Sequence, residues 1–320
     1  MKPLYPSIKP YAQHQIKVDA LHTLYVEESG TPDGVPILFI HGGPGAGTTP
    51  EDRRFFDPER YRIILFDQRG CGHSTPHGNL ENNTTQALLS DIEAIRGYFN
   101  LKQWLLFGGS WGSTLSLLYA QAYPKCVMGM VLRGIFLGRQ QELRWFYENG
   151  AKAVFPDYWE EFVLPIPEEE RDNLISAYHK RLTGTDELAR MNAAKHWAQW
   201  EGQCATLHPC KAVLERFTQT HTAASLAAIE THFFINNCFI SENQILRDAY
   251  KLEGIPGIIV HGRYDMICPF ENARALHQAW PGSELYVIRD AGHSSMEPGI
   301  VDALVTATEK MLQITAKTNG

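Results

Sequence analysis

A Gly-x-Ser-x-Gly segment at residues 108–112 lies between an apolar run at 103–107 and a helical stretch that extends to residue 123. A tight turn between a strand and a helix forces its serine into a strained backbone conformation and exposes the serine oxygen above the sheet edge. The outer glycines let the strand and the helix approach each other closely. In this context the segment predicts a nucleophilic Ser110 rather than an ordinary glycine-rich turn.

Short apolar runs alternate with helical patterns in the first and last parts of the chain. We predict strands at 36–40, 62–66, 103–107, 127–132, 257–260 and 284–288. We predict helices at 84–99, 112–123, 270–280 and 299–312. This alternation is typical of a mostly parallel sheet that helices cover on both faces, so the predicted fold class is α/β.

The strand pattern stops between about residue 137 and residue 245, where the sequence is helical in texture and rich in aromatic residues. Pro167 before three glutamates predicts one helix start, and residues 186–201 predict another helix that Gly202 closes. We expect a catalytic core made from both ends of the chain, with a helical cap domain inserted into it. The predicted division assigns residues 1–136 and 246–320 to the core and residues 137–245 to the cap.

A serine hydroxyl is a weak nucleophile until a base removes its proton. In a fold of this type an acid and then a histidine follow the serine, each in a loop after a late strand. Asp265 and His293 follow the last two predicted strands in that order, with His293 directly behind a glycine. His261 and Asp290, in the same two loops, are the alternatives. We predict that Ser110, Asp265 and His293 form a catalytic triad.

The oxyanion of an acyl-transfer reaction needs backbone N–H donors. The amide of Trp111, next to the nucleophile, is one candidate. The second should come from the HGGPG segment at 41–45, where we favour Gly43 over Gly42. Neither this glycine pair nor the one before Ser110 is followed by Lys and Ser or Thr, which argues against a phosphate-binding loop.

Charge and cysteine content limit the expected partners and location. The chain has 29 basic and 36 acidic residues, a net charge of -7, and so no electrostatic reason to bind nucleic acid or an anionic membrane. Its six cysteines show neither CxxC pairs nor metal-ligand spacing. The N-terminus has no apolar signal region, and no apolar run reaches membrane-spanning length. We therefore expect a cytoplasmic protein with no bound metal.

Three motifs together resemble the proline iminopeptidases, a family of α/β-hydrolases: HGGPG at 41–45, DQRGCG at 67–72 and GSWGS at 109–113. The resemblance spans essentially the whole chain, including the expected cap. It implies a cytosolic serine peptidase without metal or cofactor, which releases an N-terminal proline from small peptides through an acyl-enzyme. It implies nothing about the oligomeric state.

The resemblance also extends to the substrate pocket. WAQWEG at 197–202 and IETHFF at 229–234 match stretches that, in the family, hold glutamates binding the substrate amine. It implies the substrate-binding residues Glu201, Glu230, Arg133, Phe136 and Phe146, with Arg133 near the carboxylates and Phe136 against the proline ring. From composition alone, such glutamates are usually solvated and such aromatic residues usually belong to the core.

Two other functions stay open at this point. The same fold and triad could hydrolyse another small amide or an ester, because a fold does not fix a substrate. A non-catalytic binding protein on the same scaffold is less consistent with an intact triad. We expect Asp67 and Arg69, in the DQRG motif, to brace neighbouring turns rather than to act on the substrate.

Overall fold

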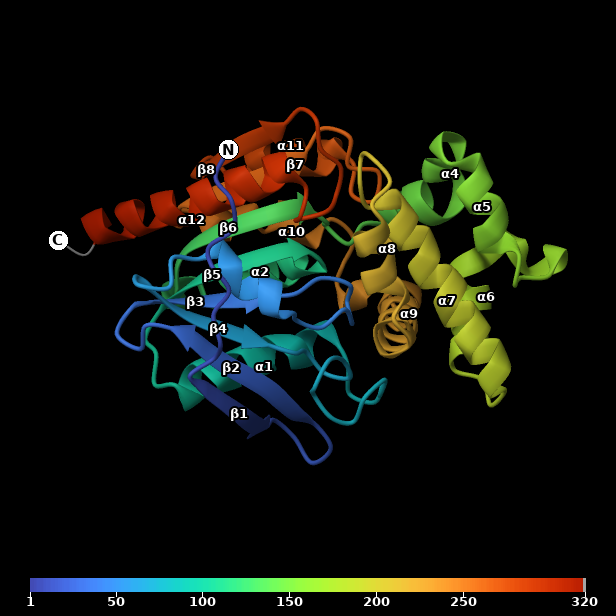
Figure 1. Cartoon of the computed structure of the whole chain (residues 1–320), viewed down its shortest axis with the longest axis horizontal. Helices are drawn as coiled ribbons and strands as arrows, with labels where there is room; N and C mark the ends of the chain where they lie inside the picture. The colour runs from blue at the N-terminus through green and yellow to red at the C-terminus, as the bar shows by residue number, and fades with distance from the viewer. Residues whose placement is uncertain (319–320) are drawn as a thin grey trace.

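The computed structural model describes residues 1–318, in which an eight-stranded sheet is covered by helices and a further group of helices lies to one side (Figure 1). The strands are β1 (Ala12–Lys17), β2 (Thr23–Gly30), β3 (Val35–Ile40), β4 (Tyr61–Phe66), β5 (Trp104–Ser110), β6 (Val127–Ile135), β7 (Gly257–Gly262) and β8 (Ser283–Ile288). Their order is β1-β2-β4-β3-β5-β6-β7-β8. Only the pairings of β2 with β1 and β4 are antiparallel, so β3 to β8 present their carboxyl ends at one edge.

The central strands are apolar on both faces because the sheet is covered on both sides. In β3, Leu38 and Ile40 join one hydrophobic cluster, and Ile37 and Phe39 join the cluster on the opposite face. All six predicted strands are confirmed. The prediction missed β1 and β2. In the edge strand β1 exposed polar side chains alternate with less exposed ones, and β2 carries the buried polar residues Glu27, Glu28 and Ser29 near its end.

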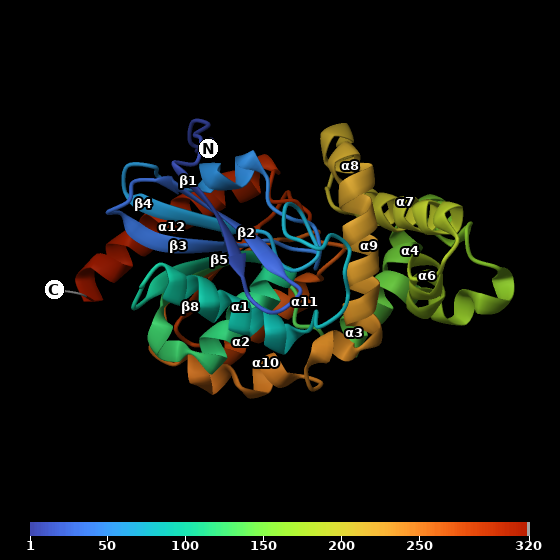
Figure 2. The same ribbon diagram turned by 90° about the horizontal axis from the view of Figure 1, so that it is seen from below.

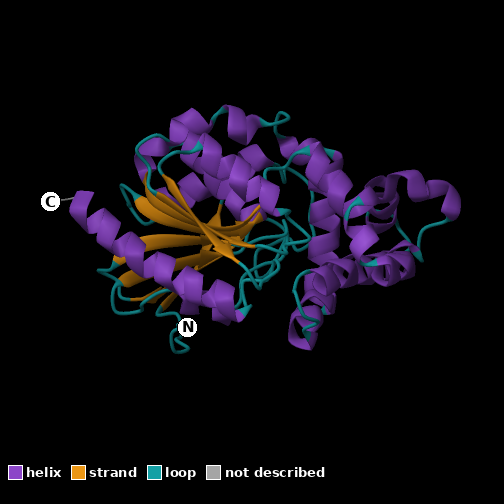
Figure 3. Cartoon of the chain, turned by 90° about the horizontal axis from the view of Figure 1, so that it is seen from above, coloured by secondary structure: helices purple, strands orange, loops and turns teal. Residues whose placement is uncertain are grey.

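Helices pack on both faces of the sheet (Figure 3). Side chains of α1 (Thr85–Tyr98), α2 (Trp111–Ala122) and α11 (Phe270–Ala279) belong to the cluster on one face. The cluster on the other face contains side chains of α12 (Pro298–Thr318) and of the short 3₁₀ helix η1 (Pro50–Phe55). The predicted core helices are confirmed, although α12 extends well beyond the predicted end at residue 312.

The chain between β6 and β7 is helical, and we call its helices the cap helices. They are α3 (Gln140–Arg144), η3 (Trp145–Asn149), α4 (Ala151–Val154), α5 (Pro156–Val163), η4 (Glu168–Asn173), α6 (Leu174–Leu182), α7 (Glu187–Cys204), α8 (Lys211–Thr218), α9 (Thr220–Ile235), η5 (Asn237–Phe239), α10 (Gln244–Arg247) and η6 (Ala249–Leu252). Helix α9 stands between the sheet and the outer cap helices α4, α6 and α7 (Figure 2). The domain limits at 137 and 245 stay a prediction.

Two details of the predicted cap are wrong. Pro167 is the N-cap of a 3₁₀ helix and not the first residue of an α-helix. Gly202 does not end its helix, because α7 continues to Cys204. The glycine instead permits close packing against α8: a Cβ atom there would lie 3.1 Å from Leu214 and 3.2 Å from Phe217. Among residues 1–318, no helix combines the length and the hydropathy that a membrane span requires.

Candidate active site

Ser110 ends β5 and immediately precedes α2, at the carboxyl edge of the parallel strands. Its backbone has φ 58° and ψ -126°, a conformation that non-glycine residues rarely adopt and that costs conformational energy. The following turn has no space for a side chain at Gly112, where a Cβ atom would lie 2.0 Å from Ile40 O. The Gly-x-Ser-x-Gly pattern is therefore required by the close approach of α2 to β3.

Asp265 and His293 lie in the loops after β7 and β8, and their side chains meet. His293 Nδ1 donates a hydrogen bond to Asp265 Oδ2 at 2.7 Å. The other carboxylate oxygen accepts from the amides of Ile267 at 3.1 Å and Cys268 at 2.8 Å. Burial lowers the pKa of His293, an effect that Asp265 opposes and Arg133 reinforces. The imidazole is therefore neutral near pH 7, as a general base must be.

The two alternative residues have other environments. His261 is buried; Ile135 N donates to its Nδ1 at 3.1 Å, and its Nε2 bonds Cys268 O at 2.8 Å. Both ring nitrogens are thus occupied by the backbone, and His261 supports the Asp265 loop. Asp290 is exposed to solvent.

Arg133, near the end of β6, contacts His293. Its Nη1 lies 3.2 Å from His293 Nε2 and donates to His293 O at 2.8 Å. These hydrogen bonds go to His293 and not to the carboxyl groups of Glu201 and Glu230, beside which the resemblance had put Arg133. The guanidinium still lines the same cavity as both glutamates.

The two loops expected to form the oxyanion hole are joined by Gln68, whose importance the sequence interpretation missed. Its amide nitrogen donates to His41 O at 2.9 Å, and its amide oxygen accepts from Trp111 Nε1 at 3.0 Å. Gly42 and Gly43 line the cavity, and a Cβ atom on Gly42 would lie 3.3 Å from Ser110 Cβ. The assignment of the donors to Gly43 and Trp111 stays a prediction.

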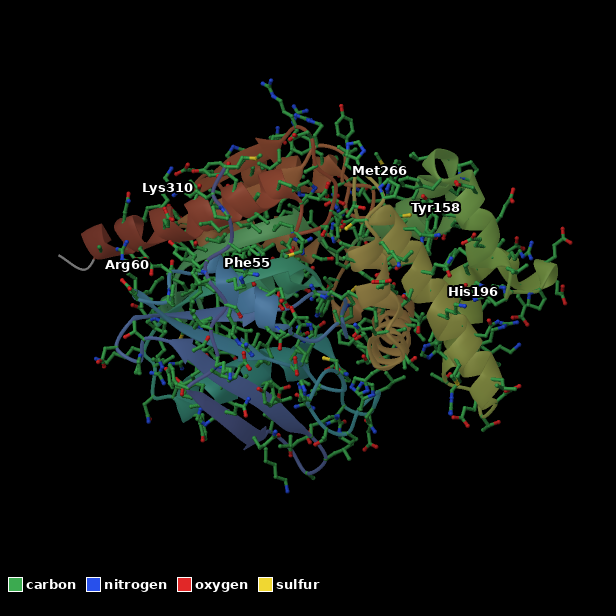
Figure 4. The ribbon with its side chains drawn as sticks, viewed as in Figure 1. Phe55, Arg60, Tyr158, His196, Met266 and Lys310 are labelled. Atoms are coloured by element: carbon green, nitrogen blue, oxygen red, sulfur yellow. The ribbon has the colours of Figure 1, made fainter. Side chains whose placement is uncertain are left out.

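A cavity of about 430 Å³ connects these loops with the cap helices. Its lining includes Ser110 and His293 from the core and Glu201 and Glu230 from the cap. A volume of this size suits a small ligand. Figure 4 places Met266, which follows Asp265 in the chain, where the core meets the cap helices. There Trp145 Nε1 donates to Met266 O at 2.8 Å.

Glu201 on α7 and Glu230 on α9 are buried and hydrogen-bond to each other. Tyr147 donates its hydroxyl to Glu201 Oε1 at 2.7 Å, and Trp197 Nε1 donates to Glu230 Oε2 at 2.6 Å. Burial is the main cause that raises the pKa of both Glu201 and Glu230. Two carboxyl groups in contact must share a proton unless a cation neutralises them, so the pair is suited to bind a protonated amine.

Aromatic rings surround the carboxyl pair. Phe136 lies at the cavity wall against Phe234, with ring centroids 6.0 Å apart, and Phe146 stacks on Trp200 at 5.3 Å. Tyr147 also stacks on Trp197 at 4.6 Å, so both partners of the glutamates are fixed by packing. The sequence interpretation missed the roles of Tyr147 and Trp197, although Trp197 begins the segment 197–202 and Tyr147 directly follows Phe146.

Asp67 and Arg69 brace the structure separately rather than as a pair. Asp67 Oδ1 accepts from the amide of Thr48 at 2.7 Å, and Arg69 binds the carboxylate of Asp91 through two nitrogens at 2.6 and 2.7 Å. Neither residue lines the cavity. Within residues 1–318, no three His, Cys, Asp or Glu side chains are grouped so that they could hold a metal ion.

All six cysteines lie within the described residues and are free thiols. Cys268 lines the cavity, and burial raises the pKa of its thiol well above the ordinary value. Cys71 is buried away from the cavity lining, with its sulfur 3.1 Å from Gln68 O.

Comparison with known proteins agrees with this geometry. A family model described as "alpha/beta hydrolase fold" matches residues 35–299. An esterase from Exiguobacterium antarcticum has a similar structure, with a TM-score of 0.59 and 20% sequence identity over 92% of this chain and 96% of that chain. At this low identity the likeness shows the fold alone. The predicted fold class is confirmed.

Two relatives are similar over nearly the whole chain. A proline iminopeptidase from Arabidopsis thaliana is 52% identical over 310 residues, which cover 96% of this chain and 82% of that protein. A proline iminopeptidase from Xylella fastidiosa is 49% identical over 313 residues, which cover 98% of this chain and 100% of that protein.

Proposed function

Because the chain belongs to the proline iminopeptidase family of α/β-hydrolases, we propose that it is a serine exopeptidase releasing N-terminal proline from short peptides. The single observation that carries this substrate assignment is the buried pair of Glu201 and Glu230, which opens onto the same cavity as Ser110 and His293. The pair demands a cation, and the protonated secondary amine of an N-terminal proline is one.

In the proposed reaction, His293 Nε2 leaves its hydrogen bond with Arg133 and forms one with Ser110 Oγ. It then takes the serine proton as the hydroxyl attacks the prolyl carbonyl. The amides of Gly43 and Trp111 hold the oxyanion. Protonated His293 then gives its proton to the leaving amine. Water enters, loses a proton to His293 and hydrolyses the acyl-enzyme, which releases proline and restores Ser110. Asp265 keeps the imidazole oriented in every step.

The cap helices supply the specificity in this proposal. When the protonated amine binds, the proton shared by Glu201 and Glu230 leaves to solvent, and the amine pairs with both carboxylates. Phe136 and Phe146 enclose the proline ring with apolar surface. A blocked N-terminus would leave two buried acids without a counter-charge, so it is strongly disfavoured. A neutral ester gains nothing from the carboxyl pair, which weighs against an ester as the preferred substrate.

The deciding experiment compares kcat/KM on L-proline β-naphthylamide with its N-acetylated form and with L-alanine β-naphthylamide. We expect strong preference for the free prolyl substrate and its loss on acetylation. Equal turnover of blocked and free substrates would refute the exopeptidase assignment. A fluorophosphonate probe should label the unmodified chain but not the Ser110→Ala variant; labelling of neither would favour a binding protein. The cytoplasmic location and the lack of nucleic-acid or membrane partners stay predictions from the sequence.

A further inference from the structure

The loop that carries His293 is bonded directly to the end of cap helix α7. Ala205 O, at the C-cap of α7, accepts from the amides of His293 at 3.0 Å and Ser294 at 2.7 Å. These two hydrogen bonds join backbone to backbone, so they do not depend on the side chains at the three positions. The α7 helix therefore ends on the catalytic loop.

A carboxylate completes this junction. Glu297 Oε1 accepts from Gly292 N at 2.9 Å, and its Oε2 accepts from Leu207 N at 3.2 Å. Gly292 directly precedes the catalytic histidine, whereas Leu207 belongs to the segment that follows α7. One side chain thus holds the amide before His293 and an amide of the cap at the same time.

The two segments are packed too closely for an alternative arrangement. A Cβ atom on Gly292 would lie 3.0 Å from Leu207 N and 3.2 Å from Glu297 Oε1. Any larger residue there would push the cap segment away from the catalytic loop. The glycine before His293 is therefore explained by the junction with the cap.

The junction links the two halves of the site. Glu201 lies one helical turn before Ala205 on α7, so the position of its carboxyl group follows the position of the helix end. His293 lies at the other side of the same junction. The hydrogen bonds of Ala205 O and of the Glu297 carboxylate therefore fix the distance from the amine-binding carboxyl group to the general base.

We propose that Glu297 is a positioning residue for the exopeptidase reaction: it holds α7 and the His293 loop together, so that a substrate anchored by its amine presents its carbonyl to the triad. This inference rests on the proposed function. It assigns Glu297 no contact with the substrate. Its effect should be confined to substrates that use both the carboxyl pair and the triad.

The test uses Glu297→Gln in the full chain, with L-proline β-naphthylamide and p-nitrophenyl acetate as substrates. A glutamine can accept only one of the two hydrogen bonds, and its NH₂ group faces the other amide. We expect kcat/KM on the prolyl substrate to fall about 20-fold, because misplacement of a held substrate is costly. The ester needs only the triad, which Asp265 still orients, so its kcat/KM should fall less than about threefold.

A double-variant cycle with Glu201→Gln tests whether the effect of Glu297→Gln depends on the contact between Glu201 and the substrate amine. Once the amine contact is lost, the position of α7 matters little, so adding Glu297→Gln to Glu201→Gln should cost less than about threefold on the prolyl substrate. Equal losses on both substrates, or a full loss in the Glu201→Gln background, would overturn the proposal. The retained ester activity also reports that the variant is folded.

Glu284→Gln is the matched control, since this glutamate on β8 pairs with Lys310 at 2.6 Å and its side chain is 43% exposed. It should leave both activities unchanged. Turnover of L-proline β-naphthylamide by the unmodified chain tests the proposed function separately. Its absence would refute that function before any Glu297 variant is made, whereas parallel losses in the variant would refute the positioning role alone.

Discussion

Nη1 of Arg133 lies 3.2 Å from Nε2 of His293, the nitrogen that takes the proton of Ser110 in the proposed reaction. Since Nδ1 of His293 donates to Asp265, Nε2 accepts from the guanidinium. The cation beside the imidazole lowers the pKa of His293, because it disfavours the protonated ring. Burial is the main cause that lowers this pKa, and Arg133 reinforces it, so both favour the neutral imidazole.

The Arg133→Gln variant should shift the acid limb of the pH profile. Loss of the positive charge raises the pKa of His293, so kcat/KM on p-nitrophenyl acetate should begin to fall at a higher pH than in the unmodified chain. The shift expected is about half a unit or more. Arg263→Gln, an exposed arginine in the Asp265 loop, is the control. An unchanged profile, or a shift to lower pH, would contradict this role.

Glu230→Gln should impair the prolyl substrate selectively. It removes one of the two negative charges that the substrate amine pairs with, so KM should rise and kcat/KM should fall about 100-fold. Hydrolysis of p-nitrophenyl acetate should change little. Glu161→Gln, on the exposed face of the cap helix α5, should leave both activities intact. Unaltered kinetics of the Glu230 variant on the prolyl substrate would remove this residue from the site.

The raised pKa values of Glu201 and Glu230 predict how substrate binding depends on pH. As the pH falls through these values, the pair becomes fully protonated and neutral, so KM for L-proline β-naphthylamide should rise. KM for the ester should stay constant over the same range. Steady-state kinetics from pH 4 to pH 9 at constant ionic strength would measure both. A parallel change for the two substrates would point to the triad as the cause instead.

The same pair should lower the stability of the empty protein at higher pH. Its pKa values are raised above those of the unfolded chain. The contribution of the pair to the free energy of unfolding is therefore most favourable below the ordinary glutamate pKa. It decreases as the pH rises towards the raised values. Glu201→Gln removes one ionisable group, so it should increase the free energy of unfolding by about 1 kcal/mol at pH 8 and by less at pH 5. Denaturant unfolding at both pH values measures this difference; a larger gain at pH 5 would contradict it.

Cys268 and the exposed Cys210 should account for any inhibition by bulky thiol reagents, because both line the cavity that Ser110 also lines. A mercurial attached there would block the site without touching the triad. Replacing both cysteines with alanine should keep activity within about threefold and lose the sensitivity, whereas Cys71→Ala should remain as sensitive as the unmodified chain. Full activity after complete modification of all thiols would disprove the obstruction.

Local sequence was sufficient to predict the features of this protein that depend on the backbone geometry of a few neighbouring residues. Ser110 lies in a strained turn between a strand and a helix, and this turn requires glycine on either side of the serine, as in the Gly-x-Ser-x-Gly pattern. The central strands are buried on both faces and therefore read as continuous apolar runs. Asp265 and His293 were found by their places after late strands, because parallel strands bring such loops to one edge. Strands β1 and β2 escaped detection because both carry many polar residues, exposed in β1 and buried in β2.

Tertiary structure decided the contacts between segments that are far apart in the chain. Gln68 joins His41 to Trp111, Tyr147 bonds Glu201, and Glu297 bonds Leu207, which lies 90 positions away in the chain. A glutamate in a loop has the same local signature whether it is solvated or holds two distant amides. What distinguishes the two cases is burial and the direction of neighbouring N–H groups, and both exist only after the cap has packed on the core.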